Sequence, residues 1–470
     1  MRDPGTPGHL PPHIRLMLNL ASFRGAQQLS YPSDLAASLL QKGIEVGDVI
    51  KVVRDDGLVV EGILMPRPKG GRYIVVKLKN GYNVGIDVRR IKELELVAKR
   101  KPQRREKGEK PPRRPGYPLV KVLGTGGTIA SRIDYETGAV KPAMSTEELV
   151  EEVPELLDYA DVEAEQIMDV LSENMTPEMW SRVAEAVHAE LLREEVAGVV
   201  VAHGTDTMVY TASAVAFAIR EINKPVVFVG AQRSSDRPSS DATLNLIGAT
   251  IAAARSDIAE SIIAMHGESS DTFVVLHRAT RTKKFHSTRR DAFQSICAQP
   301  LAYVWPWTGD VEPKSRPLRT RGDWTPKLMN SFEPRVLQLR AYPGMPPDLL
   351  YLAKDKGFKG VIIEGTGMGH VPEYLVDAIK ELTESGIFVG VTTQCVHGTT
   401  NLNVYATGRK MLEAGATPLG DMLTEVATVK LMWALANYPP EEVPKVMVTP
   451  LEGELRERRL LRDYRLSYRR

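Results

Sequence analysis

The sequence has little cysteine. Only Cys297 and Cys395 occur in 470 residues. Two thiols cannot build the disulfide framework of a secreted mini-protein or a zinc site with four thiolates. Both cysteines lie in apolar stretches of sequence, so we expect packed thiols, without a catalytic role, in a protein of the reducing cytoplasm.

The sequence also lacks a long apolar run and an excess of one charge. We find no apolar stretch near 18 residues, and Pro, Gly and His stand where a signal peptide needs apolar residues. Lys and Arg number 61 against 59 Asp and Glu, a formal charge of +2. These absences predict no membrane span, and they exclude a whole-molecule attraction to nucleic acid, so any basic surface must be local.

What is present is enough chain for about three folding units. We expect residues 1–44, which contain several prolines, to form a loose arm. Residues 45–98 hold short β-rich runs separated by turn signals such as Asp56-Gly57 and Asn80-Gly81, which predict a small SH3-like or Tudor-like β-barrel. Residues 99–116 carry nine Lys or Arg, two Glu and four prolines, the composition of a basic, stiff linker.

Beyond the linker, strand-like and helix-like segments alternate, which is typical of an α/β fold with parallel sheets. AGVVVAHG at 197–204 and KPVVFVGA at 224–231 read as buried strands, and Thr176-Pro177-Glu178 predicts the start of a helix that runs to about 192. A Trp, Pro and Gly-rich stretch then interrupts the alternation. We therefore predict two α/β domains, at 117–330 and 331–470.

Two similar turns follow predicted strands. They are Gly124-Thr125-Gly126-Gly127-Thr128 and Gly204-Thr205-Asp206-Thr207. Ligands of open α/β sheets bind at the carboxyl ends of strands, where glycine lets a ligand approach the backbone. The first turn matches neither G-x-x-x-x-G-K-[ST] nor G-x-G-x-x-G, so a nucleotide site there is disfavoured.

A third segment, Thr282-Lys283-Lys284, adds a base to these hydroxyls. A free threonine hydroxyl is a poor nucleophile and needs a neighbouring base, which a lysine beside Asp206 would supply. The alternative from spacing alone is a surface charge pair. His286 and His397 lack metal-ligand spacing, so we assign no metal.

The motifs together resemble the bacterial-type L-asparaginase and glutaminase family. The similar segments are TGGTIAS at 125–131, VVAHGTDTM at 200–208 and the lysine segment at 282–293, within a similarity that covers about 118–440. The resemblance implies a two-domain α/β fold. It also implies four catalytic residues: Thr128, Thr205, Asp206 and Lys284.

The same resemblance implies how an amide would bind and react. Ser172 and Glu173 match the substrate-binding pair, and Tyr135 and Thr137 match the loop that closes over the substrate. Backbone N–H groups at Gly127 and Thr205 would stabilise the oxyanion. Thr128 would attack the side-chain carboxamide of glutamine or asparagine and release ammonia. The residues themselves leave open which threonine forms the covalent bond, because both lie on equivalent turns.

A closer resemblance is to the D subunits of archaeal glutamyl-tRNA(Gln) amidotransferases. It is carried by the predicted barrel, by RSSDRPSSDATLNL at 233–246, by HSTRRDAFQS at 286–295 and by VYATGRKMLEAG at 404–415. In two respects the chain departs from the pattern: its N-terminal arm is long, and Thr399-Thr400 stand where an Arg-Val pair is expected.

This resemblance implies a glutaminase subunit that supplies ammonia for converting Glu-tRNA(Gln) to Gln-tRNA(Gln). The partner would be the E subunit, which would use ATP and Mg²⁺ and make most of the tRNA contacts, while this chain would hold no cofactor. A homodimeric core within a heterotetramer is expected. The alternatives are a stand-alone cytosolic L-asparaginase with an accessory barrel and a non-catalytic scaffold, and the four competent side chains argue against the scaffold.

Overall fold

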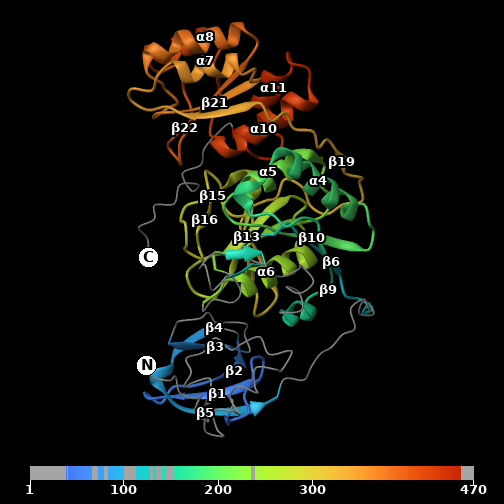
Figure 1. Ribbon diagram of the computed structural model, residues 1–470. Coiled ribbons are helices and arrows are strands. Elements are labelled where there is room, and N and C mark those ends of the chain that lie inside the picture. The colour runs from blue at the N-terminus through green and yellow to red at the C-terminus, as the bar shows by residue number, and fades with distance from the viewer. Residues whose placement is uncertain are drawn as a thin grey trace, which may run out of the picture. The chain divides into compact units, whose positions relative to one another are not determined.

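The computed structural model describes residues 39, 41–65, 72–78, 83–99, 113–126, 153–233 and 239–456, together with the backbone of 131–133 and 140–142. The chain divides into two compact units, one of residues 1–78 and 84–103, the other of 79–83 and 104–470 (Figure 1). Most of the predicted arm at 1–44 and of the predicted linker at 99–116 lies outside the described residues.

The first unit is an antiparallel β-domain of five strands in the order β4-β3-β2-β1-β5. The second strand alternates exposed and buried residues, as expected when one face of a sheet covers a core and the other meets water. The core holds Ile50, Val52, Leu64, Ile74 and Val76 among others. The predicted small barrel-like domain is confirmed. Its strands are β1 Val49–Arg54, β2 Val59–Leu64, β3 Tyr73–Lys77, β4 Asn83–Asp87 and β5 Ile91–Ala98.

The second unit is built on an eight-stranded sheet in the order β18-β17-β14-β13-β12-β10-β6-β9. The five strands from β9 to β13 are parallel, and β14, β17 and β18 continue the sheet antiparallel. The strands are β6 Leu119–Gly124, β9 Asp161–Gln166, β10 Val196–Ala202, β12 Val226–Val229, β13 Ser261–His266, β14 Val274–Arg278, β17 Ala302–Trp305 and β18 Asp310–Pro313.

Helices cover both faces of this sheet, which explains why its central strands are apolar throughout. Val199 and Val201 pack in the core with α4 (Pro177–Leu191) and α5 (Met208–Ala218). Val200 and Ala202 point to the other face, where α6 (Ala242–Arg255) packs. The predicted helix that follows Thr176 and the predicted strands at 197–204 and 224–231 are confirmed.

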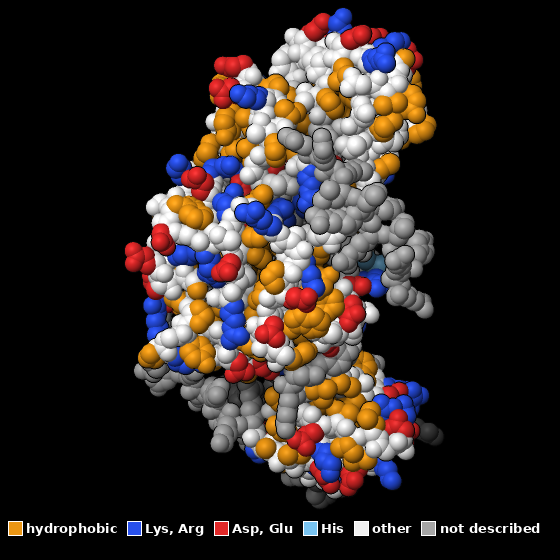
Figure 2. All heavy atoms as spheres, turned by 180° about the vertical axis from the view of Figure 1, so that it is seen from behind, with side chains coloured by type: hydrophobic (Ala, Val, Ile, Leu, Met, Phe, Trp, Pro, Cys, Tyr) orange, Lys and Arg blue, Asp and Glu red, His pale blue; other side chains and the backbone are white. Residues whose placement is uncertain are grey.

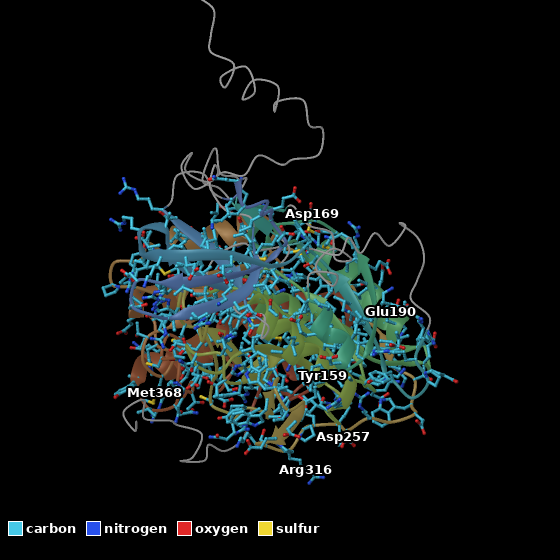
Figure 3. The ribbon with its side chains drawn as sticks, turned by 90° about the horizontal axis from the view of Figure 1, so that it is seen from below. Tyr159, Asp169, Glu190, Asp257, Arg316 and Met368 are labelled. Carbon is cyan, nitrogen blue, oxygen red and sulfur yellow. The ribbon has the colours of Figure 1, made fainter. Side chains whose placement is uncertain are left out.

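Strand β6 of this sheet carries a buried charged residue. Lys121 on β6 is 7% exposed, and its Nζ lies 2.6 Å from Glu165 of β9 and 3.4 Å from Glu190. Glu190 is near the end of α4 and is labelled in Figure 3. The lysine is tolerated because carboxylates from two elements compensate its charge.

The second α/β domain has a four-stranded parallel sheet in the order β20-β21-β22-β23. Val361, Ile363, Val389 and Val391 face one core, while Ile362 faces the core that contains α10. The elements are β20 Val336–Arg340, α7 Asp348–Asp355, β21 Gly360–Gly365, α8 Val376–Glu384, β22 Phe388–Thr393, α9 Ala406–Glu413, β23 Thr417–Pro418, α10 Thr424–Asn437 and α11 Val443–Val448.

Helices α5 and α10 join the two domains. Phe217 of α5 stacks on Trp433 of α10 with 5.8 Å between ring centroids, and both rings are fully buried. One hydrophobic core therefore contains residues of both sheets. This agrees with the neighbouring positions of α5 and α10 in Figure 1, and it confirms the predicted two-domain α/β fold.

Three two-stranded ribbons complete the described structure. They are β7 Ser131–Ile133 with β8 Val140–Pro142, β11 Ile219–Arg220 with β19 Lys327–Leu328, and β15 Thr282–Lys284 with β16 Phe293–Ser295. The predicted domain boundary near 330 falls between β19 and β20. Within the described residues, no helix is long and apolar enough to cross a bilayer.

The prediction of two packed thiols is half wrong. Cys297 is buried, but Cys395 is exposed. Cys395 comes two residues after the end of β22, and its N–H donates to Thr393 Oγ1 at 3.0 Å. At this point the chain has left the buried strand, and the packing that covers β22 does not extend to the thiol.

Candidate active site

The candidate site lies where the order of strands along the chain reverses in the sheet. From β6 the chain passes to β9 on one side, and α4 later carries it back to β10 on the other side of β6. The loops after β6 and β10 therefore diverge, and such a switch point is where open α/β sheets bind ligands. Thr125 and Gly126 follow β6, and Gly204 to Thr207 follow β10.

The side chain of Lys284 meets the second of these turns. Its Nζ lies 2.9 Å from Thr205 Oγ1 and 2.6 Å from Asp206 Oδ1. The side chain of Lys284 is 13% exposed, whereas that of Asp206 is 67% exposed. One amino group thus joins a buried hydroxyl to a solvent-facing carboxylate, which is an arrangement that can move a proton to or from the hydroxyl.

The neighbouring Lys283 points elsewhere. Its Nζ forms an ion pair with Glu425 Oε1 at the start of α10. Successive side chains on a strand point to opposite sides, so only one of the two adjacent lysines can face Thr205. The structure brings Lys284 to the turn.

Ser172 and Glu173 lie beside the same turn. Ser172 is buried, and its carbonyl oxygen accepts a hydrogen bond of 2.6 Å from Thr207 Oγ1. A Cβ on Gly204 would stand 2.7 Å from both Cβ and Oγ of Ser172, so this close approach requires glycine. Glu173 is exposed. The Ser172 hydroxyl is therefore held next to the Thr205 turn, and Glu173 follows it in the chain.

The first turn begins alongside β10. Thr125 donates its hydroxyl to Ala202 O at 3.0 Å, and Thr125 O accepts from Val170 N at 3.0 Å. Gly126 has φ +97°, and a Cβ there would meet Val170 N at 2.6 Å. Asp169, labelled in Figure 3, is also next to Gly126.

Four predicted site residues lie outside the described residues. They are Gly127, Thr128, Tyr135 and Thr137. The backbone of β7 and β8, on either side of Tyr135 and Thr137, pairs antiparallel. Among the described site residues, the fold brings Ser172, Glu173, Thr205, Asp206 and Lys284 together.

His203 holds the backbone of the Thr205 turn. It is fully buried, and its Nδ1 donates to Gly204 O at 2.7 Å because a carbonyl oxygen can only accept. Burial lowers the pKa of His203 to about 4, so the imidazole is neutral. It also packs edge-on against Phe228. This histidine therefore both orients the backbone carbonyl of Gly204 and packs at the end of β10.

A buried polar chain fixes the segment after β12, and sequence reasoning gave it no role. Asp241 accepts the N–H groups of Gln232 and Arg233 at 3.0 Å, and it accepts Asn245 Nδ2 at the same distance. Asn245 Oδ1 in turn accepts from His266 Nδ1 at 2.6 Å. The signal was an Asp and an Asn four residues apart at a helix start, which places both on one face.

Within the described part of the chain, no three His, Cys, Asp or Glu residues are grouped so that they could hold a metal ion.

Family models match three parts of the chain. Residues 119–319 match "Asparaginase, N-terminal", and 335–447 match "Glutaminase/Asparaginase C-terminal domain". Residues 44–97 match "GatD N-terminal domain".

Among solved structures, the L-asparaginase of Thermococcus kodakarensis is similar with a TM-score of 0.65 and 33% identity. The match covers 72% of this chain and 100% of that one. L-asparaginase I of Vibrio cholerae is similar with a TM-score of 0.62 and 26% identity, over 72% of this chain and 99% of that one.

Curated relatives match over more of the chain. The D subunit of the glutamyl-tRNA(Gln) amidotransferase of Pyrococcus furiosus is 48% identical over 89% of this chain and 96% of the relative. The protein of the same name from Methanopyrus kandleri is 45% identical over 92% of this chain and 96% of its own length. The chain therefore belongs to the family of glutamyl-tRNA(Gln) amidotransferase D subunits.

Proposed function

We propose that this chain is the glutaminase subunit of a tRNA-dependent amidotransferase in the cytoplasm. It hydrolyses glutamine and supplies the ammonia with which Glu-tRNA(Gln) becomes Gln-tRNA(Gln) on a partner subunit. One observation carries the choice over a free asparaginase. The asparaginase match covers 72% of this chain and all of the other, whereas residues 44–97 match the N-terminal domain model of the D subunit.

The geometry around Lys284 supports the chemistry of amide hydrolysis. In the proposed sequence, a threonine hydroxyl attacks the side-chain carbonyl carbon of glutamine, its proton passes to the leaving nitrogen, and ammonia departs. Water then cleaves the γ-glutamyl ester and regenerates the hydroxyl. We propose Thr128 as the nucleophile and the Thr205, Asp206 and Lys284 group as the proton carrier, because Nζ contacts both oxygens.

We propose that charge complementarity orients the substrate. Glu173 and Asp206 are exposed carboxylates beside the turn and suit the α-ammonium group. Ser172 suits the α-carboxylate, Tyr135 and Thr137 close over the bound amide, and the N–H groups of Gly127 and Thr205 stabilise the oxyanion.

We propose that the partner, an E subunit, performs the ATP-dependent step with Mg²⁺, and that this chain holds no cofactor. The balanced charge of the chain supports tRNA contact mainly through the partner. On the face shown in Figure 2, Lys and Arg side chains lie among Asp and Glu over most of the described surface. We propose a homodimer of this chain as the core of a heterotetramer.

The test is ammonia release from glutamine and from asparagine by the purified chain, alone and with the E subunit, Glu-tRNA(Gln) and ATP. We expect glutamine hydrolysis to appear or rise in the complete mixture. The Lys284→Met variant should lose about 100-fold or more of that activity, because a positioned acid-base group contributes about this much. Fast asparagine hydrolysis by the chain alone, indifferent to the partner and tRNA, would make it a free asparaginase and overturn the proposal.

A further inference from the structure

The strand that carries Lys284 is not part of the eight-stranded sheet. Among the described strands, β15 pairs with β16 alone, with Lys284 opposite Phe293. The hydrogen-bond ladder that fixes β6 and β10 therefore does not extend to the lysine. Its position relative to Thr205 must be set by other contacts.

The residues just before β15 are bonded to the second domain. The Arg281 guanidinium is buried; it donates a hydrogen bond to Asp421 Oδ1 at 3.1 Å and lies 3.0 Å from Asp421 Oδ2 in an ion pair. Its Nε also donates to Gly453 O at 2.7 Å. Thr280 Oγ1 donates to Glu452 O at 2.7 Å. These contacts secure the amino-terminal end of the strand.

Lys283 provides the contact nearest the lysine of the site. Its side chain and that of Glu425 are 27% and 19% exposed, so the ion pair between them is largely withdrawn from solvent. Arg340, Glu364 and Asp421 line the same pocket as this pair. The second oxygen of Glu425, Oε2, is buried without a hydrogen-bond partner in the part of the chain that the structure describes. Loss of Lys283 would thus leave a partly buried carboxylate without its described hydrogen bond.

We propose that the Lys283–Glu425 ion pair positions Lys284, so that the second domain sets the placement of its Nζ against Thr205 and Asp206. This inference rests on the proposed function. Adjacent side chains on a strand point to opposite sides. The ion pair that holds Lys283 against α10 therefore also fixes the side of the strand to which Lys284 points. A displacement of about 1 Å in a catalytic group can cost about 100-fold in rate. Lys283 and Glu425 are positioning residues, without contact to the reacting atoms.

The kinetic test compares Glu425→Gln, Lys283→Met and the double variant in the complete amidotransferase. We expect kcat to fall about tenfold in each single variant with KM within about twofold, since the substrate-binding side chains are untouched. The double variant should fall little further than either single one, because both remove the same interaction. Lys283→Arg keeps the cation and should retain most of the activity.

The matched control is Glu381→Gln. It removes the carboxylate of an exposed ion pair in the same domain, Lys354–Glu381, whose atoms are 2.8 Å apart. This variant should leave kcat unchanged. A general weakening of the second domain would lower activity in the control as well as in Glu425→Gln, and that result would overturn the proposal.

A second readout does not depend on amidase activity. Competitive acetylation by acetic anhydride, read by mass spectrometry, measures the reactivity of the Lys284 amine as a function of pH. We expect Glu425→Gln to change that reactivity at least about threefold, because the amine loses its fixed place between two oxygens. If the wild type releases no ammonia, the proposed function fails while the labelling still tests the positioning. Identical labelling profiles and kcat values in wild type and Glu425→Gln would disprove the inference.

Discussion

At the scale of single residues, the Thr205 turn depends on two nitrogen bases with different surroundings. Lys284 meets a carboxylate at 2.6 Å, while His203 is fully buried with a carbonyl oxygen as its partner. Burial beside a neutral acceptor favours the neutral form of the His203 imidazole. The two bases therefore support the turn differently: Lys284 contacts the hydroxyl, and His203 holds the backbone of Gly204.

The neutral state of His203 predicts a dependence of stability on pH. Its pKa is lowered to about 4 in the folded protein from 6.5, so below pH 6.5 the unfolded chain binds a proton that the folded chain does not. Stability is therefore greatest above pH 6.5 and falls as the pH drops toward 4. Between pH 7.5 and 5 the loss from this residue is about 2 kcal/mol.

The measurement is the free energy of unfolding of wild type and His203→Asn in urea at several pH values. Asparagine can still donate to Gly204 O. The variant should be less stable at pH 7.5 and should lose about 2 kcal/mol less than wild type on going to pH 5. Buried His277, whose pKa is lowered to about 3, contributes equally to both proteins and cancels. Parallel pH curves would show that His203 is not the neutral group inferred here.

At the scale of elements, α4 and β15 differ in where the residues that determine them lie: close by in the sequence for α4, and far away for β15. The start of α4 is specified by adjacent residues, since Thr176 Oγ1 accepts from Met179 N at 3.4 Å and Pro177 occupies the first helical position. Strand β15 is only three residues long and depends on contacts with distant residues such as Asp421 and Glu425. A local signal predicts the first kind of element and misses the orientation of the second.

The cap of α4 can be tested by substitution. Thr176→Ala removes the oxygen that satisfies an N–H of the first turn, and it should lower the free energy of unfolding by about 1 kcal/mol. Thr176→Ser keeps the oxygen and should cost less than half of that. Chemical denaturation measures both values. Equal losses in the two variants would show that the threonine methyl group, rather than the cap, is what stabilises the helix.

At the scale of the whole molecule, the C-terminal segment joins the two α/β domains through buried charges. Lys430 of α10 and Glu454 are both fully buried, with Nζ and Oε1 2.5 Å apart. Glu452 in the same segment pairs with Arg220 and Arg319 of the first domain. Each carboxylate is buried with a cation, so removing one partner leaves an uncompensated charge in the interior.

Lys430→Met should therefore destabilise the protein strongly, by about 3–5 kcal/mol. Thermal and urea unfolding of the second unit would measure the loss. The double variant Lys430→Met, Glu454→Gln removes both charges and should recover part of the stability. A single variant as stable as wild type would mean that water or another cation compensates Glu454.

The sequence by itself determined the features that depend on neighbouring residues. Uninterrupted apolar runs predicted buried strands such as β10, and Thr176-Pro177 predicted the start of α4. Hydroxyl-bearing glycine turns at strand ends indicated where the site lies, because the carboxyl ends of parallel strands share one edge of a sheet.

Only the tertiary structure decided what depends on contacts between distant residues. The family resemblance had assigned Lys284 to the site, but only the structure shows why Lys284 and not Lys283 faces Thr205, 79 positions away in the chain: the pairing of β15 with β16 and the ion pair of Lys283 with Glu425 determine which side of the strand each lysine occupies. Cys395 is exposed although it closely follows the buried strand β22. Burial and orientation are properties of the assembled domains, and a residue acquires them only when distant segments pack against it.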